Sequence, residues 1–240
     1  MLKYEVIAAD IQKSIEDGAL KPNEKLPTVV ELCELYGVSK ITVRRAMEWL
    51  VENGLVASRR GSGTFVKKPI TLPENPLVTG SNERAEGFSA QHYKHSERVT
   101  SKVYDFSVVT PPAHIAELLN IEPDDFAYYH CRVRLSDDVP IAIEYTYMPL
   151  DLIPGLKRQH LYGSVYRYLR DEIGLTLSSF HRAIRAVPAT ESEAERLDTE
   201  VGAPLLELEQ VGYLDSGIPF EYSRSRNVGE RYVLNNITLA

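Results

Sequence analysis

The chain has 240 residues, of which 43% are hydrophobic and 25% charged, a composition typical of one large or two modest globular domains. It contains no run of about 18 apolar residues, so the sequence predicts no membrane-spanning helix. The N-terminal residues lack the layout of a signal peptide, and two cysteines, Cys33 and Cys131, are too few for a disulfide framework. We therefore expect a cytoplasmic protein with no membrane partner.

The net charge of -7 is unevenly distributed along the chain. Residues 1–68 contain eleven Lys/Arg and nine Asp/Glu, whereas residues 69–240 contain 16 basic and 25 acidic residues. Residues 40–68 alone hold seven basic and two acidic side chains. A basic segment of this kind can neutralise phosphate groups although the rest of the molecule is acidic. The asymmetry indicates two domains with different partners.

Three helices are predicted in the basic N-terminal part. An isoleucine at every fourth position predicts the first, over about residues 4–17. Thr28 and Glu31 have the spacing of a capping box, which begins a short second helix that stops at Gly37. Ser39 then caps a third helix. Two short helices joined through one glycine and a capping serine form a helix-turn-helix.

The third helix and the hairpin after it carry the candidate DNA-binding residues. The first two turns of the helix are basic on the side opposite its apolar face, as in a recognition helix that meets base edges and phosphates. Between the predicted strands Leu55–Val56 and Thr64–Val66, a glycine-rich tip lets the backbone approach DNA closely. Each feature alone is often a solvated basic surface, but their order favours double-stranded operator DNA. The residues assigned to DNA binding are Ser39, Lys40, Thr42, Arg44, Arg45, Arg59, Arg60, Gly61 and Gly63.

These segments resemble the DNA-binding domain of the GntR superfamily. The resemblance covers about residues 3–67 and rests on the stretches 37–46 and 60–66. It implies a winged helix-turn-helix. Lys40 and Val30 depart from the family pattern, so we expect an operator preference that differs from the family norm. The DNA contacts that the resemblance implies are Ser39, Thr42, Arg44, Gly61 and Gly63.

A linker and a second domain follow. Residues 69–85 contain three prolines and little apolar periodicity, which predicts a linker between domains at 1–68 and 86–240. Beyond it, apolar runs joined by tight Asp and Gly turns predict an antiparallel sheet with helices packed on it, an α+β domain. The predicted strands are Arg98–Val109, Phe126–Leu135, Ile141–Met148, Leu205–Leu214 and Pro219–Arg226, and the predicted helices are Ala113–Leu119, Gly163–Ile173 and Glu191–Leu197.

The second domain resembles the UTRA effector domain that marks the HutC subfamily. The resemblance implies a chorismate-lyase-like antiparallel sheet with flanking helices, which binds a ligand and does not catalyse a reaction. The matching segments are Gly87-Phe88-Ser89, Arg132-Val133-Arg134, Pro140 to Glu144, Ser164-Val165-Tyr166 and Gly217 to Ser225.

These segments carry residues suited to a small anion. Arg132 and Arg134 stand two apart on a predicted strand and therefore point to one face, where a phosphate matches the two guanidinium groups. The start of a helix at Ser164 can add donors, and two glutamates can accept hydrogen bonds from sugar hydroxyls or an amino group. A solvated or salt-bridged pair of arginines is the alternative. The residues assigned to the effector are Phe88, Ser89, Arg132, Arg134, Glu144, Ser164, Tyr166 and Glu221.

The hairpin after Arg134 sets a geometric condition on this pocket. In a regular hairpin with an even number of loop residues, Glu144 faces away from the arginines. The assignment of Glu144 to the same pocket therefore requires an odd loop or a bulge.

The six histidines are scattered, and no nucleophile elbow or phosphate loop is present, so we expect no enzyme, metal or cofactor. We expect a homodimer, most simply a repressor, that binds a palindromic operator and is released by a small anionic metabolite. The resemblance favours a phosphorylated sugar such as glucosamine 6-phosphate. A carboxylate-sensing regulator, or a constitutive DNA-binding dimer whose C-terminal domain only dimerises, stays an alternative.

Overall fold

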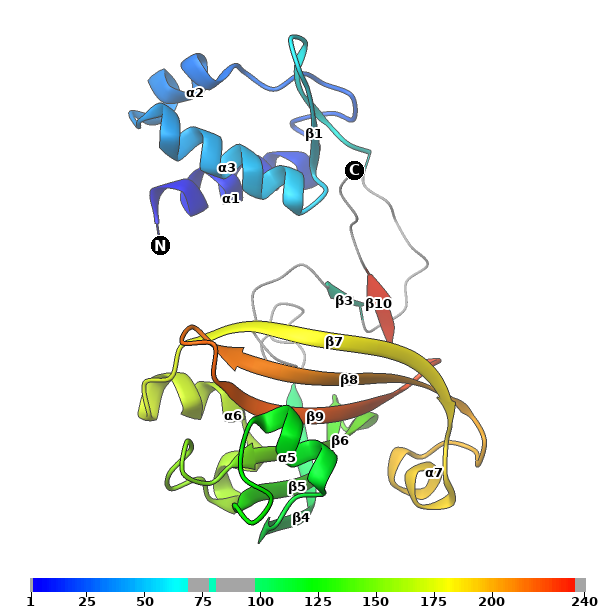
Figure 1. The fold of residues 1–240 in the computed structure, drawn as a ribbon. Helices are drawn as coiled ribbons and strands as arrows, with labels where there is room; N and C mark the ends of the chain where they lie inside the picture. The colour runs from blue at the N-terminus through cyan, green and yellow to red at the C-terminus, as the bar shows by residue number, and fades with distance from the viewer. Residues whose placement is uncertain (1, 69–77, 81–97, 236–240) are drawn as a thin grey trace. The chain divides into compact units, whose positions relative to one another are not determined.

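The computed structural model describes residues 2–68, 78–80 and 98–235 (Figure 1). The chain divides into two units, one formed by residues 1–74 with 235–240 and the other by residues 75–234. This division falls inside the segment predicted as a linker. In the described part of the chain, no helix is both long and apolar enough to cross a membrane.

Three helices and a two-stranded hairpin form the N-terminal unit. The isoleucine stripe of the first helix packs in one core with the apolar face of the third helix, which includes Val43 and Leu50. The predicted winged helix-turn-helix is confirmed. Its elements are α1 (Lys3–Glu16), α2 (Val29–Tyr36), α3 (Lys40–Glu52), β1 (Val56–Arg59) and β2 (Gly63–Val66).

Short-range hydrogen bonds and one glycine determine where α2 and α3 begin and where α2 ends. The backbone N–H of Thr28 donates to the Glu31 carboxylate (2.6 Å), and the N–H of Glu31 donates to the Thr28 hydroxyl (3.3 Å). Gly37 ends α2 with a φ of 62°, a left-handed conformation that favours glycine. Ser39 begins α3 by accepting a hydrogen bond from the N–H of Thr42 (3.3 Å). Caps of this kind stabilise a helix by about 1 kcal/mol each.

A six-stranded antiparallel sheet is the centre of the second unit, in the order β4-β5-β6-β9-β8-β7 (Figure 1). The strands are β4 (Val99–Val109), β5 (Ala127–Ser136), β6 (Val139–Pro149), β7 (Leu177–Pro188), β8 (Pro204–Leu214) and β9 (Pro219–Val228). Helical segments are α5 (Ala113–Leu119), α6 (Val165–Arg167) and α7 (Glu191–Leu197), with the short turns η1 (Arg158–Tyr162) and η2 (Tyr168–Glu172). The predicted α+β class is confirmed.

Different elements cover the two faces of this sheet. On one face, called the inner face here, Arg132 of β5 donates to the carbonyl of Leu161, so η1 lies over it. On the opposite, outer face, Ile115 of α5 packs with Tyr222 of β9. Helix α7 also lies on the outer face, where its side chains contact β6 and β9. Alternate residues of each strand therefore belong to two separate environments.

Three segments differ from the sequence prediction. No strand is predicted at β7, because its sequence shows no apolar alternation. Most of its side chains are exposed, and the strand forms because its backbone pairs with β8 along its whole length. The predicted helix Gly163–Ile173 is split into α6 and a single π-helical turn, η2. The predicted linker contains a short strand, β3 (Val78–Gly80), which pairs with β10 (Val233–Asn235).

Candidate functional site

Helix α3 presents its basic residues away from the core. Lys40 and Arg44 are exposed, whereas Val43 is fully buried on the opposite side of the helix. The hydroxyls of Ser39 and Thr42 lie 3.0 Å apart and help to begin the helix. Each hydroxyl retains hydrogen-bonding capacity that a phosphate could use. The first two turns of α3 are therefore free to meet DNA.

Arg45, also assigned to DNA binding, is held by the first helix. Its guanidinium carbon lies 4.5 Å from the ring centroid of Tyr4, a cation–π geometry. Tyr4 is buried and Arg45 is exposed, so the contact fixes the position of a surface charge beside α3.

An exposed isoleucine on the same surface is absent from the residues that the sequence predicts. The side chain of Ile41 is 78% exposed and points away from the core face of α3. Only polar and basic side chains are predicted to contact DNA on this surface. An apolar residue at the outermost position of a recognition helix was the available signal, since apolar groups contact the methyl group of thymine.

The hairpin β1–β2 carries two arginines at its tip. Arg59 is paired with Gly63 across the ladder, Arg60 lies in the turn, and both arginines are exposed. The φ angles of Gly61 and Gly63, 76° and 121°, favour glycine. A Cβ at Gly63 would lie 2.5 Å from the Lys25 side chain. Lys25 thus adds a positive charge beside the wing that the sequence prediction did not include.

A bulge in the hairpin β5–β6 brings Glu144 opposite Arg132. The loop has two residues, Asp137 and Asp138, and an even loop alone would turn Glu144 to the outer face. A register shift between Arg134 and Leu135 places Arg132 opposite Glu144. Arg132 Nε then donates to the Glu144 carboxylate at 2.7 Å. The structure therefore meets the geometric condition through a bulge.

Both arginines of this strand are buried on the inner face. Arg132 is 7% exposed and Arg134 is 1% exposed. Arg132 donates to the carbonyls of Leu161 (2.9 Å) and Gly163 (3.3 Å), and Arg134 also donates to the carbonyl of Gly163 (3.3 Å). The sequence predicted backbone donors at this helix start. Instead a carbonyl faces the arginines, and the Ser164 hydroxyl accepts a bond from an N–H of its own turn (3.2 Å).

The charges in this cluster change one another's pKa values. Burial by itself would raise the pKa of Glu144, but Arg132 and Arg134 hold it below the ordinary value. Burial, and then the charge of Arg132, lowers the pKa of Arg134 to about 9, so Arg134 is cationic at neutral pH. The cluster therefore places two cationic guanidinium groups and one carboxylate side by side on the inner face.

Glu221 and Tyr166 join the cluster from β9 and α6. The Glu221 carboxylate is buried and accepts hydrogen bonds from Tyr166 (2.8 Å), Ser223 (2.8 Å) and Gln210 (3.2 Å). Burial raises the pKa of Glu221, these three bonds oppose the rise, and Glu144 adds to it. Ser223 and Gln210 were not predicted, because their contact with Glu221 depends on how β8 and β9 pair.

The structure brings together six of the eight residues assigned to the effector. Phe88 and Ser89 lie outside the described residues. Among the described ranges, no group of three or more His, Cys, Asp or Glu side chains could hold a metal ion.

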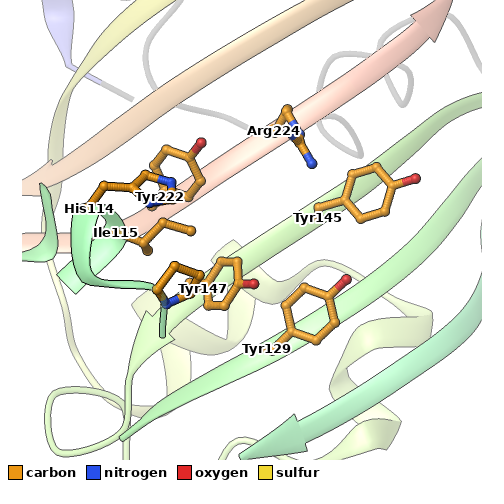
Figure 2. A pocket seen from close by; sticks show the side chains of 8 residues that line it. His114, Ile115, Tyr129, Tyr145, Tyr147, Tyr222 and Arg224 are labelled. Carbon is orange, nitrogen blue, oxygen red and sulfur yellow. The ribbon is translucent and has the colours of Figure 1, made fainter. Parts of the chain in front are cut away.

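A separate pocket of about 200 Å³ lies on the outer face (Figure 2). Its lining contains none of the residues assigned to the effector, and the sequence does not predict it. Tyrosine rings from three strands surround it, together with one arginine. Its lining residues are Pro112, His114, Ile115, Tyr129, Tyr145, Tyr147, Tyr222 and Arg224.

Two family models match the chain. The model of bacterial regulatory proteins of the gntR family matches residues 3–66, and the UTRA domain model matches residues 94–233. The chain belongs to the GntR family. Its UTRA domain is consistent with the HutC subfamily that the sequence resemblance implied.

Relatives of this GntR-family chain match it over most or all of its length. The HTH-type transcriptional regulator GmuR of Bacillus subtilis is 32% identical over 239 residues, covering 100% of this chain and 99% of the relative. MngR of Escherichia coli, a mannosyl-D-glycerate transport/metabolism system repressor, is 34% identical over 223 residues, covering 92% and 90%. The crystal structure of YydK from B. subtilis superposes with a TM-score of 0.80 at 32% identity, covering 100% of each chain. The chain is thus a DNA-binding transcription regulator with an effector domain, and not an enzyme.

Proposed function

We propose that this protein is a cytoplasmic homodimeric repressor that leaves a palindromic operator when it binds a small phosphorylated sugar. The observation that carries the proposal is that Arg132 and Arg134 are both buried on one face of the same strand, beside Glu144. Two neighbouring guanidinium groups repel each other unless an anion lies between them. A phosphate group suits two neighbouring guanidinium groups.

The remaining groups of the cluster suit the sugar. Glu144 and Glu221 can accept hydrogen bonds from hydroxyls or an amino group, and Tyr166 and Ser164 carry hydroxyls at the same site. Phe88 and Ser89 are proposed as further effector contacts. The relative MngR is a repressor of a system for a mannosyl compound, which supports a sugar-derived ligand here. Glucosamine 6-phosphate is the first candidate.

We propose that α3 enters the major groove and that the wing contacts the adjacent backbone. Arg44 and Lys40 are then placed to meet bases or phosphates, and Arg45 to meet a phosphate. Arg59 and Arg60 are placed to meet phosphates at the wing. Ser39, Thr42, Gly61 and Gly63 complete the proposed contacts, the first two through hydroxyls and the glycines through their backbone.

Fluorescence anisotropy on DNA from the gene's own upstream region tests this function. We expect tight, salt-sensitive binding that glucosamine 6-phosphate weakens and unphosphorylated glucosamine does not. Arg132→Ala should keep the DNA affinity and lose the response, because the anion then lacks half of its site. Arg98→Ala is the matched control, since Arg98 is exposed at the start of β4.

Other outcomes identify the alternatives. A response to carboxylates and not to phosphorylated sugars would make the protein a carboxylate sensor. Binding that no small anion alters would make it a constitutive DNA-binding dimer.

A further inference from the structure

A row of polar side chains crosses the inner face beside the arginine pair. The strand register places His130 of β5 opposite Thr146 of β6, Thr146 opposite Ser223 of β9, and Ser223 opposite Gln210 of β8. His130 stands two residues before Arg132 on the same strand, so both point to the inner face, about 7 Å apart along the backbone. The row therefore extends the proposed effector site away from the arginines.

His130 is the unusual member of this row. Its side chain is 1% exposed, yet neither Nδ1 nor Nε2 has a hydrogen-bond partner among the described residues. A neutral imidazole has one donor and one acceptor, and buried polar groups in proteins are nearly always paired. Two unpaired nitrogens beside a charged cluster indicate that a further group forms hydrogen bonds with them.

The surroundings of His130 keep its ring uncharged. Burial and the charge of Arg132 lower the pKa of His130 to about 3, and Arg134 adds to the lowering. These effects outweigh the opposing charge of Glu144. At physiological pH the neutral ring therefore has one N–H that can donate a hydrogen bond and one nitrogen that can accept one. A hydroxyl group also donates one and accepts others, so it complements this ring.

We propose that His130 determines effector specificity by hydrogen-bonding an uncharged hydroxyl of a ligand whose anionic group is bound by Arg132 and Arg134. This inference rests on the proposed function and deepens it. The ligand class is a polyhydroxylated monophosphate, in which the phosphate and a hydroxyl are separated by the body of the molecule. Inorganic phosphate would occupy only the arginine end of the site.

Two variants of the full-length chain test the role of His130. His130→Leu removes both nitrogens at similar volume, and His130→Asn retains a donor and an acceptor. His114→Leu is the matched control, because His114 lines the pocket on the outer face. Isothermal titration calorimetry measures the affinity of each variant for glucosamine 6-phosphate, glucose 6-phosphate and inorganic phosphate.

We expect His130→Leu to bind both sugar phosphates about tenfold more weakly than the wild type, because one buried hydrogen bond to the ligand is lost. Its affinity for inorganic phosphate should stay within about twofold of the wild-type value. His130→Asn should recover part of the loss, and His114→Leu should bind all three probes normally. The thermal midpoint of ligand-free His130→Leu should not fall, because an apolar group replaces an unpaired polar one.

Three results would overturn the inference. Sugar phosphates that bind His130→Leu and His130→Asn as tightly as the wild type would leave the proposed function intact and remove the role of His130. If His130→Leu lost affinity for inorganic phosphate by the same factor as for the sugar phosphates, His130 would only support the arginines. If the wild-type chain bound none of the three probes, the proposed function itself would fail. Should His130→Leu not fold, the ratio of sugar phosphate to inorganic phosphate affinity in His130→Asn decides the question.

Discussion

Three outward-facing residues of α3 differ in their chemistry. Arg44 can donate two hydrogen bonds to a guanine, whereas Lys40 acts as a compact point charge. Ile41 lies between them in sequence and offers only apolar contact. Because charged side chains also bind phosphates of any sequence, the apolar residue is the cleaner probe of base recognition.

We therefore predict that Ile41→Ala weakens operator binding by about 1 kcal/mol through the loss of a thymine contact. Binding to unrelated DNA should not change, since phosphates do not contact this side chain. Stability should not fall, because Ile41 is 78% exposed. Anisotropy on operator and scrambled duplexes measures both affinities.

Leu35→Ala is the control for Ile41, as Leu35 is 71% exposed on the preceding helix α2. An operator affinity that is identical in Ile41→Ala and the wild type would rule out the contact.

At the scale of elements, one carboxylate attaches α7 to the outer face of the sheet. Glu193 is 2% exposed and accepts two hydrogen bonds from Arg226 (2.8 and 3.0 Å) and one from Tyr145 (3.0 Å). It also accepts bonds from Thr190 in the capping box of α7. Burial would raise the pKa of Glu193, but these hydrogen bonds, first those from Thr190, hold it below the ordinary value.

The lowered pKa predicts how stability depends on pH. The stability that Glu193 contributes is complete above its unfolded pKa, near 4.5, and is lost as the pH falls through the lower folded pKa. Glu193→Gln should lower the free energy of unfolding at neutral pH by about 2 kcal/mol, because Arg226 loses one of its two buried carboxylate partners and keeps Glu207. Its stability should also fall less steeply on acidification. Urea unfolding over about pH 3 to 7 measures both effects.

Glu195→Gln serves as the control on the same helix, since Glu195 is exposed. If the Glu193→Gln and Glu195→Gln variants unfolded at the same urea concentration across this pH range, Glu193 would not have this stabilising role.

At the scale of the whole molecule, the two units have separate hydrophobic cores. One core joins α1, α2, α3 and the wing, and the cores of the sheet contain no residue of that unit. The residues proposed for operator DNA all belong to the first unit, and those proposed for the effector all belong to the second. A ligand that binds only the folded state stabilises the unit to which it binds.

We predict two calorimetric transitions that respond to different ligands. Glucosamine 6-phosphate should raise the midpoint temperature of the UTRA unit only. At a concentration one hundred times its Kd, it should increase the free energy of unfolding of this unit by about 2.7 kcal/mol. Operator DNA should raise only the transition of the winged helix-turn-helix. Differential scanning calorimetry with each ligand separately measures these shifts. A single transition that both ligands raise would show that the units unfold together.

The sequence by itself determined the winged helix-turn-helix and most strands of the sheet. The capping box of Thr28 and Glu31, the stop at Gly37 and the cap at Ser39 join residues at most five positions apart, so their geometry follows from local spacing. Strands with apolar runs were predicted to within a few residues for the same reason. The pairing of Arg132 with Arg134 on one face also followed from a spacing of two.

Only the tertiary structure decided which side chains meet across strands. The bulge at Arg134 brings Glu144 to the inner face, and the register of β5 with β6 places His130 beside Thr146. Strand β7 exists only because β8 pairs with it. A shift of one residue in any of these pairings would move a side chain to the other face, and no local pattern specifies that shift. Local geometry therefore determined the winged helix-turn-helix, and long-range strand register decided which side chains meet at the proposed effector site.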